Sequence, residues 1–122
     1  MGLKERLHQA LASRAEIEAG EERQQAARSA GATPVSDVHD RSRATVSGVL
    51  RSVTLRPREG VPALEAELYD GSGSLDLVWL GRRQIHGVEP GRRLRAEGLV
   101  CTVDGRRTVF NPRYELVPRP GE

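Results

Sequence analysis

The chain has 122 residues, of which 37% are hydrophobic and 3% aromatic, and its formal net charge at pH 7 is only +2. Cys101 is the only cysteine, which excludes an intramolecular disulfide, and no apolar run approaches the ~20 residues that a membrane-spanning helix requires. We therefore expect one compact domain with an appended segment, located in the cytoplasm and without contact to a membrane.

The first thirty residues have the pattern of an amphipathic helix with a thin apolar stripe. Large apolar side chains recur at roughly helical spacing between charged ones, at Leu3, Leu7, Leu11 and Ile17. A glycine and a proline follow, which predicts that the helix spans residues 1–30 and that residues 31–42 form a linker. A helix this weakly apolar lies on the following domain, pairs with a second copy or stays free in solution. We expect Val35 and Val38 in the linker to contact the domain.

Residues 62–81 have the pattern of a β-hairpin. Two runs of alternating apolar residues flank the tetrapeptide Asp70–Gly73, whose glycines permit the positive φ angles of a tight turn. Because strand side chains alternate between two faces, we expect one set to point inward: Leu64, Ala66, Leu68, Leu75, Leu77 and Trp79. The other set is expected to point outward: Glu65, Glu67, Tyr69, Asp76, Val78 and Leu80.

The segments on either side of this hairpin predict a further strand and a short helix. Residues 43–55 are rich in β-branched side chains and predict a long first strand that bends at Gly48. Residues 82–91 are too few for an ordinary helix and end in a proline and a glycine. They therefore predict a short helix or a helical turn.

The remainder of the chain predicts two more strands. Alternation resumes in residues 94–103, and residues 107–117 supply a fifth strand that is broken at Pro112. The expected domain therefore comprises residues 43–117, and residues 118–122 form a tail. The order of its elements is three strands, a short helix and two strands.

That order describes the oligonucleotide/oligosaccharide-binding (OB) fold, an all-β Greek-key barrel of five strands. The run VSGVLRSVTLRPREGVPALEAELYDGSGSLDLVWLGRRQIHGVEPGRRLRAEGLV resembles small standalone OB-fold proteins of actinobacteria. It is similar, more distantly, to the barrels that bind tRNA anticodons in class II aminoacyl-tRNA synthetases and to the wedge domain of a fork-reversing helicase. The resemblance covers roughly residues 43–117, and it implies a nucleic-acid-binding domain.

Arginine supplies nearly all the positive charge of the predicted barrel, and it can fork onto phosphates and stack on bases. Arg56 and Arg58 lie in the loop between the first two strands, and Arg106 and Arg107 in the loop between the last two. In an OB fold both loops border the outer face of the second and third strands. We expect these four arginines to hold successive phosphates and Tyr69 to stack a base. Four further arginines are expected to extend the basic surface: Arg51, Arg82, Arg83 and Arg113.

The face between those two loops is expected to be acidic. Glu65, Glu67 and Asp76 point outward there, and their carboxylates repel a phosphate backbone. The chain also has only four aromatic residues, whereas single-strand binders usually stack bases on exposed rings. These features support an alternative interpretation, in which the protein is a protein–protein interaction module that uses the acidic face or the N-terminal helix.

The sequence contains no catalytic constellation. Its three histidines, His8, His39 and His86, lie far apart and lack a second ligand at metal spacing. The Asp70–Gly73 turn joins two strands, so it lacks the helix N-terminus of a phosphate-binding loop. We expect a non-enzymatic protein without metal or cofactor, which binds DNA or RNA weakly, single-stranded or structured, and with little sequence preference.

Overall fold

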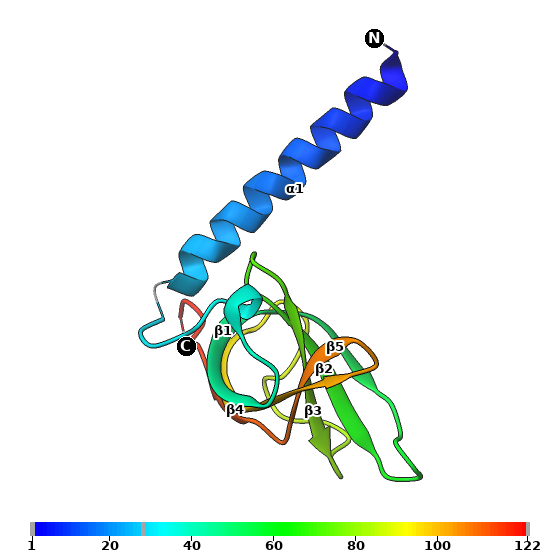
Figure 1. Ribbon diagram of the computed structural model, residues 1–122, viewed down its shortest axis with the longest axis vertical. Coiled ribbons are helices and arrows are strands. Elements are labelled where there is room, and N and C mark those ends of the chain that lie inside the picture. The colour runs from blue at the N-terminus through cyan, green and yellow to red at the C-terminus, as the bar shows by residue number, and fades with distance from the viewer. Residues whose placement is uncertain (1, 28, 122) are drawn as a thin grey trace.

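The computed structural model describes residues 2–27 and 29–121, so Met1, Arg28 and Glu122 of the predicted helix and tail lie outside the described residues. The chain begins with one long helix and continues into a β-barrel (Figure 1). The elements are α1 (Leu3–Ala27), the 3-10 helix η1 (Val35–Asp37), β1 (Ser42–Leu55), β2 (Ala63–Tyr69), β3 (Ser74–Leu80), β4 (Arg93–Val103), β5 (Arg106–Phe110) and β6 (Arg113–Leu116). The predicted N-terminal helix and mostly β architecture are confirmed.

The six strands form one sheet that closes into a ring. Their order is β1-β2-β3-β5-β4-β6, and β1 also pairs with β4, which closes the barrel. β3 and β5 run parallel, whereas the other pairs are antiparallel. The predicted break at Pro112 divides the last strand into β5 and β6, and both pieces pair with β4. Pro112 separates them because proline lacks the N–H that a ladder hydrogen bond needs.

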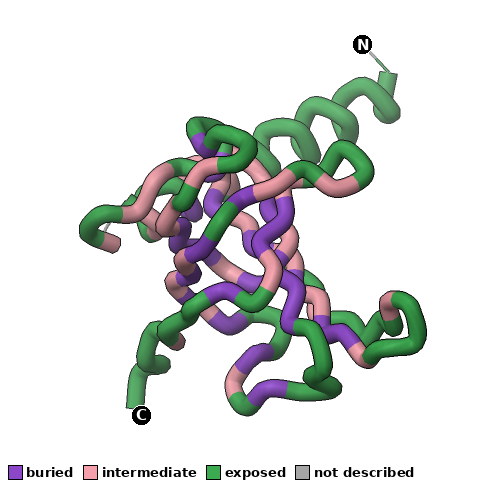
Figure 2. The backbone as a smooth tube through the Cα atoms, turned by 60° about the horizontal axis from the view of Figure 1, so that its bottom comes forward, coloured by how far each residue is buried: buried purple, intermediate pink, exposed green. Residues whose placement is uncertain are grey.

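The barrel interior is filled by the inward-facing side chains that period-two alternation predicts. All six expected inward residues of the hairpin are buried in one apolar core, and Trp79 is among them. The Trp79 ring meets Tyr114 edge to face, with 5.6 Å between ring centroids. Figure 2 shows the buried residues gathered in the barrel, while most of α1 is exposed.

The expectation that Val78 points outward needs one correction. Strand parity places Val78 on the outer face of the sheet, but its side chain is fully buried there. β5 runs alongside β3 and sets Phe110 beside Val78, and the N–H of Asn111 donates to the Val78 carbonyl at 2.7 Å. Parity assigns a side chain to a face of the sheet, but only the neighbouring strand decides whether that face is covered.

The short helix expected within residues 82–91 is not confirmed. In the described part of the chain, turns join β3 to β4, and one of them is closed by the Val88 N–H donating to Ile85 at 3.0 Å. Gly81, Gly87 and Gly91 all have positive φ angles, which interrupt a right-handed helix within a few residues. Ile85 and Val88 are buried in the core, so the connection is held by apolar contacts instead.

The hairpin turn ties the linker to the barrel through a buried carboxylate. Asp70 is only 3% exposed, and its Oδ1 accepts hydrogen bonds from the Ser72 N–H and hydroxyl and from the Gly73 N–H. Its Oδ2 accepts a hydrogen bond of 2.8 Å from the Val35 N–H. Val35 and Val38 are buried in the core, as expected for linker residues that contact the domain.

The C-terminal part of α1 lies on the barrel through polar contacts. Arg93 of β4 donates two hydrogen bonds of 2.6 Å to the Glu22 carboxylate, and Arg23 donates to the Gly71 carbonyl at 3.0 Å. Glu22 is the single helix residue that is buried among those described. The N-terminal part of α1 extends away from the barrel (Figure 1). Among the described residues no helix combines the length and the apolar character needed to cross a membrane.

We predict that deleting residues 1–30 leaves a folded barrel, because the core described above is complete without α1. The truncated protein loses the Glu22–Arg93 ion pair, so we expect its stability to fall by about 2 kcal/mol, or about 10 °C in Tm. Circular dichroism during a thermal melt measures both the strand content and the cooperativity of unfolding. A broad, non-cooperative melt would mean that α1 is part of the folding unit.

Candidate nucleic-acid interface

The outer face of β1, β2 and β3 forms a polar groove with the β4–β5 turn on its far side. The groove has a volume of about 340 Å³. It contains three of the four arginines that were expected to hold phosphates, together with the acidic residues that were expected on the same face. Its lining residues are Ser52, Thr54, Arg56, Arg58, Glu65, Ala66, Glu67, Asp76, Val103, Asp104, Arg106 and Thr108.

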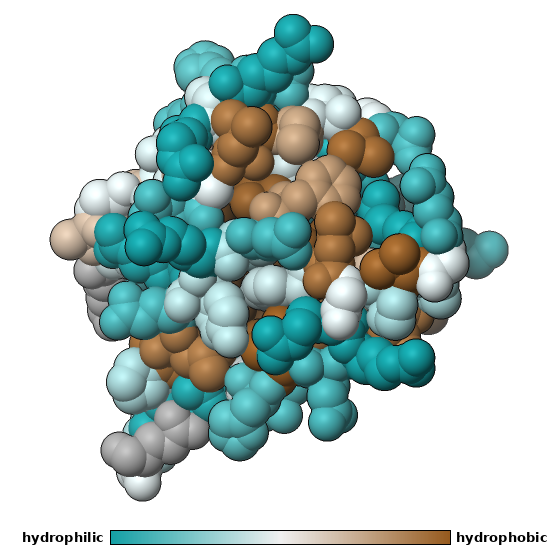
Figure 3. Space-filling model, turned by 90° about the horizontal axis from the view of Figure 1, so that it is seen from below, coloured by the Kyte–Doolittle hydropathy of each residue, from teal (hydrophilic) through white to brown (hydrophobic). Residues whose placement is uncertain are grey.

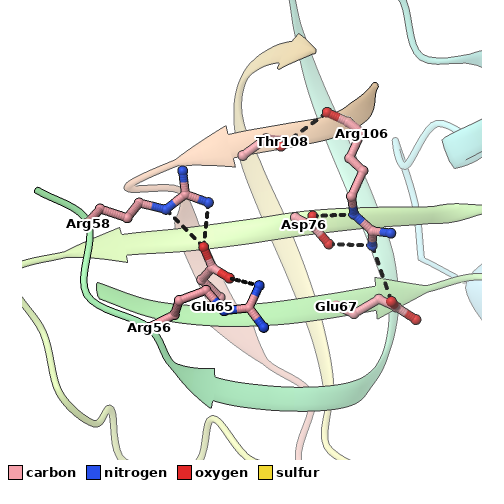
Figure 4. Close-up of polar contacts among 7 residues, drawn as sticks. All are labelled: Arg56, Arg58, Glu65, Glu67, Asp76, Arg106 and Thr108. Atoms are coloured by element: carbon pink, nitrogen blue, oxygen red, sulfur yellow. Dashed lines mark hydrogen bonds and ion pairs between the residues drawn. The ribbon is translucent and has the colours of Figure 1, made fainter. Parts of the chain in front are cut away.

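At one end of the groove, two arginines converge on a single carboxylate (Figure 4). Arg58 donates from Nε to Oε1 of Glu65 at 2.8 Å, and its Nη2 donates to the same oxygen. Nη1 of Arg56 lies 3.6 Å from the other carboxylate oxygen. The Glu65 side chain is 16% exposed, against 68% for Arg56. This arrangement fixes Arg58 more firmly than Arg56, which makes one longer contact and remains largely in solvent.

Arg106 and Arg107 were expected in the loop between the last two strands, but they are the first two residues of β5. From there Arg106 bridges two strands at the other end of the groove floor. It donates to both carboxylate oxygens of Asp76, at 2.6 and 2.8 Å, and to Glu67 at 3.2 Å (Figure 4). The hydrogen bond to Asp76 and its negative charge, with a smaller contribution from Glu67, raise the pKa of Arg106 above the ordinary arginine value. Arg106 therefore carries its positive charge at any pH at which the protein is folded.

These ion pairs cancel most of the charge of the groove. Among the described residues, three arginines and four carboxylates line it, so its formal charge is slightly negative. The sequence indicated that arginines and carboxylates would share this face. It did not indicate that they would pair, because the partners lie 7 to 39 positions apart and meet through the β1–β2 connection and the pairing of β5 with β3 and of β3 with β2.

Tyr69 lies on the outer face, beside the groove, and its ring is covered on one side. The guanidinium of Arg51 lies over it, 3.3 Å from the ring centroid. Arg51 reaches this position because the β1–β2 register shifts between Leu50 and Ser52, which leaves Arg51 as the extra residue of a β-bulge. A base arriving here meets the outer face of a guanidinium already stacked on Tyr69. Such a guanidinium is itself a stacking surface.

A second hollow, next to this stack, is overhung by α1. It has a volume of about 330 Å³. Three of its lining residues are cross-strand neighbours: Val49 of β1 lies between Arg93 of β4 and Tyr69 of β2. The helix contributes the acidic residues Glu18, Glu21 and Glu22, together with Gln25, to its lining. The acidic part of α1 therefore faces basic residues of the barrel.

Arg107 lies apart from the ion-paired groove, in a third hollow of about 390 Å³. Ser74, Thr102, Gly105 and Arg106 line it with Arg107, and none of these described residues is acidic. Ser74 is the cross-strand partner of Tyr69, so this hollow is next to the Arg51–Tyr69 stack. Ser74 and Thr102 were not foreseen, because serine and threonine next to turns are too common to single out from one sequence.

The remaining arginines expected at the interface lie elsewhere. Arg82 and Arg83 are exposed in the β3–β4 connection, and neither lines one of the three hollows described above. Arg113 begins β6, where it is the cross-strand partner of Glu97. The structure therefore brings Arg51, Tyr69, Arg106 and Arg107 into neighbouring positions and keeps these three arginines apart from them.

Among the described residues, no group of three or more histidine, cysteine, aspartate or glutamate side chains is arranged to hold a metal ion. His8, His39 and His86 accordingly lie outside any such cluster.

The sequence matches no family model and no curated protein, but the fold has counterparts among solved structures. The crystal structure of the p204 HINb domain superposes with a TM-score of 0.59 at 14% identity, over 74% of this chain and 49% of that chain. A structure of RecG bound to a three-way DNA junction gives a TM-score of 0.52 at 22% identity, over 70% of this chain and 12% of that chain. The chain thus spans less than half of either neighbour's length.

These similarities are at the level of fold. Together with the closed ring of strands, they define the protein as an OB-type β-barrel with an N-terminal helix. The expected distant similarity to OB barrels, including a helicase wedge domain, is confirmed.

Proposed function

We propose that this protein is a non-enzymatic OB-fold module that binds nucleic acid weakly and with little sequence preference through residues 43–117. One observation carries the proposal: a hollow lined by hydrogen-bond donors, without acidic residues among those described, lies directly beside a guanidinium stacked on an aromatic ring. This combination offers a place for a phosphate next to a place for a base. The RecG neighbour, whose structure contains a bound DNA junction, shares the fold over 12% of its chain and adds support.

In this proposal Arg107 makes the first phosphate contact. It lines the donor-rich hollow with Ser74 and Thr102, whose hydroxyls also donate to phosphate oxygens. Arg51 then stacks a base on the face turned away from Tyr69. Neither contact reads a base edge, so binding should depend little on sequence.

The ion-paired arginines of the groove make weaker contributions. Arg56, Arg58 and Arg106 are bonded to carboxylates, so a phosphate must displace or share a bond that already exists. Each exchange of one anion for another gains little free energy, which is the physical basis for weak binding. Arg56 is the exception within the groove, since its side chain is mostly exposed and makes one longer contact.

We predict that replacing Arg106 and Arg107 with alanine weakens binding more than replacing Arg56 and Arg58. Fluorescence anisotropy of a labelled single strand, titrated at several salt concentrations, gives the affinity and its salt dependence. Each phosphate contact that is lost should reduce the salt slope by roughly one unit. The loss should be similar for strands of different sequence, because phosphates carry no sequence information.

A matched control replaces Arg82 and Arg83, which removes the same charge from an exposed connection outside the hollows. This control should change the affinity much less than the Arg106 and Arg107 variant. An equal loss in the two variants would show that net charge alone, without a defined interface, determines binding. Wild-type protein that fails to bind at low salt would contradict the proposed function.

The charge of the groove favours a second candidate function, a protein–protein interaction module. Four carboxylates line the groove against three arginines among the described residues, and such a surface suits a partner that brings its own cations. Apolar side chains also gather on the face seen in Figure 3. The exposed large apolar residues of the barrel are Leu55, Val61, Leu80, Leu99, Tyr114 and Val117. This candidate replaces the first if no nucleic acid binds.

A further inference from the structure

The N-terminal part of α1, which extends away from the barrel (Figure 1), carries large apolar side chains that are exposed. The exposed fractions of Leu3, Leu7, Leu11 and Ile17 are 75%, 56%, 64% and 61%. At 3.6 residues per turn these residues and Ala10 fall within about a third of the helix circumference. Burying large apolar side chains removes their surface from water, so covering this stripe favours association.

The barrel of the same chain leaves the stripe exposed while α1 is docked on it. α1 is continuous to Ala27, and near its C-terminal end Glu22 and Arg23 hold it against the barrel. At 3.6 residues per turn Arg23 lies on the opposite side of the helix from the centre of the stripe, whereas Glu22 lies about 80° from that centre, close to the angular position of Leu11. The stripe therefore stays open to another molecule while the helix remains docked.

The spacing of the stripe matches that of a helix in a coiled coil. Leu3, Leu7, Ala10, Arg14 and Ile17 are separated alternately by four and three residues, as are the seam positions a and d of a heptad. Arg14 occupies one of these seam positions. In a parallel pair of identical helices Arg14 would face its own copy, and two like charges in the seam would oppose association.

We propose that α1 pairs with α1 of a second copy in the antiparallel direction. This register sets Leu7 against Ile17 of the second copy and Arg14 against the small side chain of Ala10, which leaves room for the arginine. In this register Leu11 of one helix contacts Leu11 of the other helix, next to the a and d positions. All of these residues are exposed in the single chain.

Charge complementarity selects the same direction. Lys4, Arg6 and Arg14 make the exposed N-terminal part of α1 basic, whereas Glu18 and Glu21 make the following part acidic. An antiparallel pair brings Lys4 of each copy beside Glu18 of the other, so two ion pairs form per dimer. The dipoles of two antiparallel helices point in opposite directions, and this arrangement is also electrostatically favourable. The two barrels then lie at opposite ends of the helix pair.

Sedimentation equilibrium of the full chain, over about two decades of concentration up to the millimolar range, tests the proposal. We expect a monomer–dimer equilibrium. Leu7→Glu should raise the dimer dissociation constant at least about 100-fold, because each dimer loses two buried leucines. Gln9→Glu, on the opposite side of α1, adds the same charge and should change the constant less than about threefold. Circular dichroism of each variant verifies that α1 stays helical.

A charge reversal tests the direction. Lys4→Glu and Glu18→Lys should each raise the dissociation constant about tenfold, since each places like charges together at two sites per dimer. Combining the two changes in one chain should restore the constant to within about threefold of wild type. A protein that is monomeric at every concentration, or a dimer that Leu7→Glu leaves intact, would overturn the proposal. Failure of the combined variant to recover would also overturn it.

Discussion

Replacing Gly48 with alanine should destabilise the barrel by about 2–3 kcal/mol or more and lower Tm by about 10 °C or more. β1 pairs with β4 up to Val49 and with β2 from Val49 onward, so Gly48 lies where the strand changes neighbours. A Cβ atom at this position would overlap the Tyr69 carbonyl oxygen and lie 2.9 Å from the carbonyl carbon. Backbone atoms cannot move aside as a flexible side chain can. The strand must therefore shift and weaken the ring closure.

Gly20→Ala is the matched control, because it makes the same chemical change where an added Cβ meets nothing within 4 Å. Gly20 lies inside α1, where alanine is favoured over glycine by about 1 kcal/mol. The two substitutions should thus change stability in opposite directions. Urea or thermal unfolding followed by circular dichroism measures both. A Gly48→Ala protein as stable as wild type would show that Gly48 does not lie as close to the Tyr69 backbone as described.

Neutralising the groove floor should strengthen nucleic-acid binding at low salt. Glu65→Gln, Glu67→Gln and Asp76→Asn remove three negative charges at nearly constant size, and they release Arg56, Arg58 and Arg106 from their ion pairs. We expect the affinity to rise at least about tenfold and the salt slope to steepen, because more arginines become available to neutralise phosphates. The pairs are partly exposed, so stability should fall by only about 1 kcal/mol for each pair, or less.

The control for this variant neutralises three carboxylates elsewhere on the barrel, Glu89, Glu97 and Glu115, which changes the net charge equally. Anisotropy titrations with one labelled strand compare the two variants with wild type. If the control strengthens binding as much as the floor variant does, the groove has no special role. If the floor variant binds more weakly, the acidic residues contact a basic partner, and the protein–protein interaction function replaces the one proposed.

Most of the fold was predictable from local pattern. Alternation in residues 62–81, with the Asp70–Gly73 turn between the two runs, identified β2, β3 and their inward residues. Pro112 identified the break between β5 and β6. These features are local, since burial of alternate side chains and the geometry of glycine and proline act over a few residues. The short helix expected in the β3–β4 connection was not confirmed, because short helices depend on tertiary contacts more than on pattern.

The amino-acid sequence by itself determined which residue types occupy the candidate interface. Arginines in the β1–β2 loop and next to the β4–β5 turn, carboxylates on the face between them and an outward Tyr69 all follow from strand parity and turn positions. Only the tertiary structure decided how these groups combine. Arg106 bonds to Asp76 and Glu67, and Arg51 covers Tyr69, because the pairing of β5 with β3 and a β-bulge in β1 set their positions. Parity is fixed within each strand, whereas such contacts depend on register between strands, which no single segment encodes.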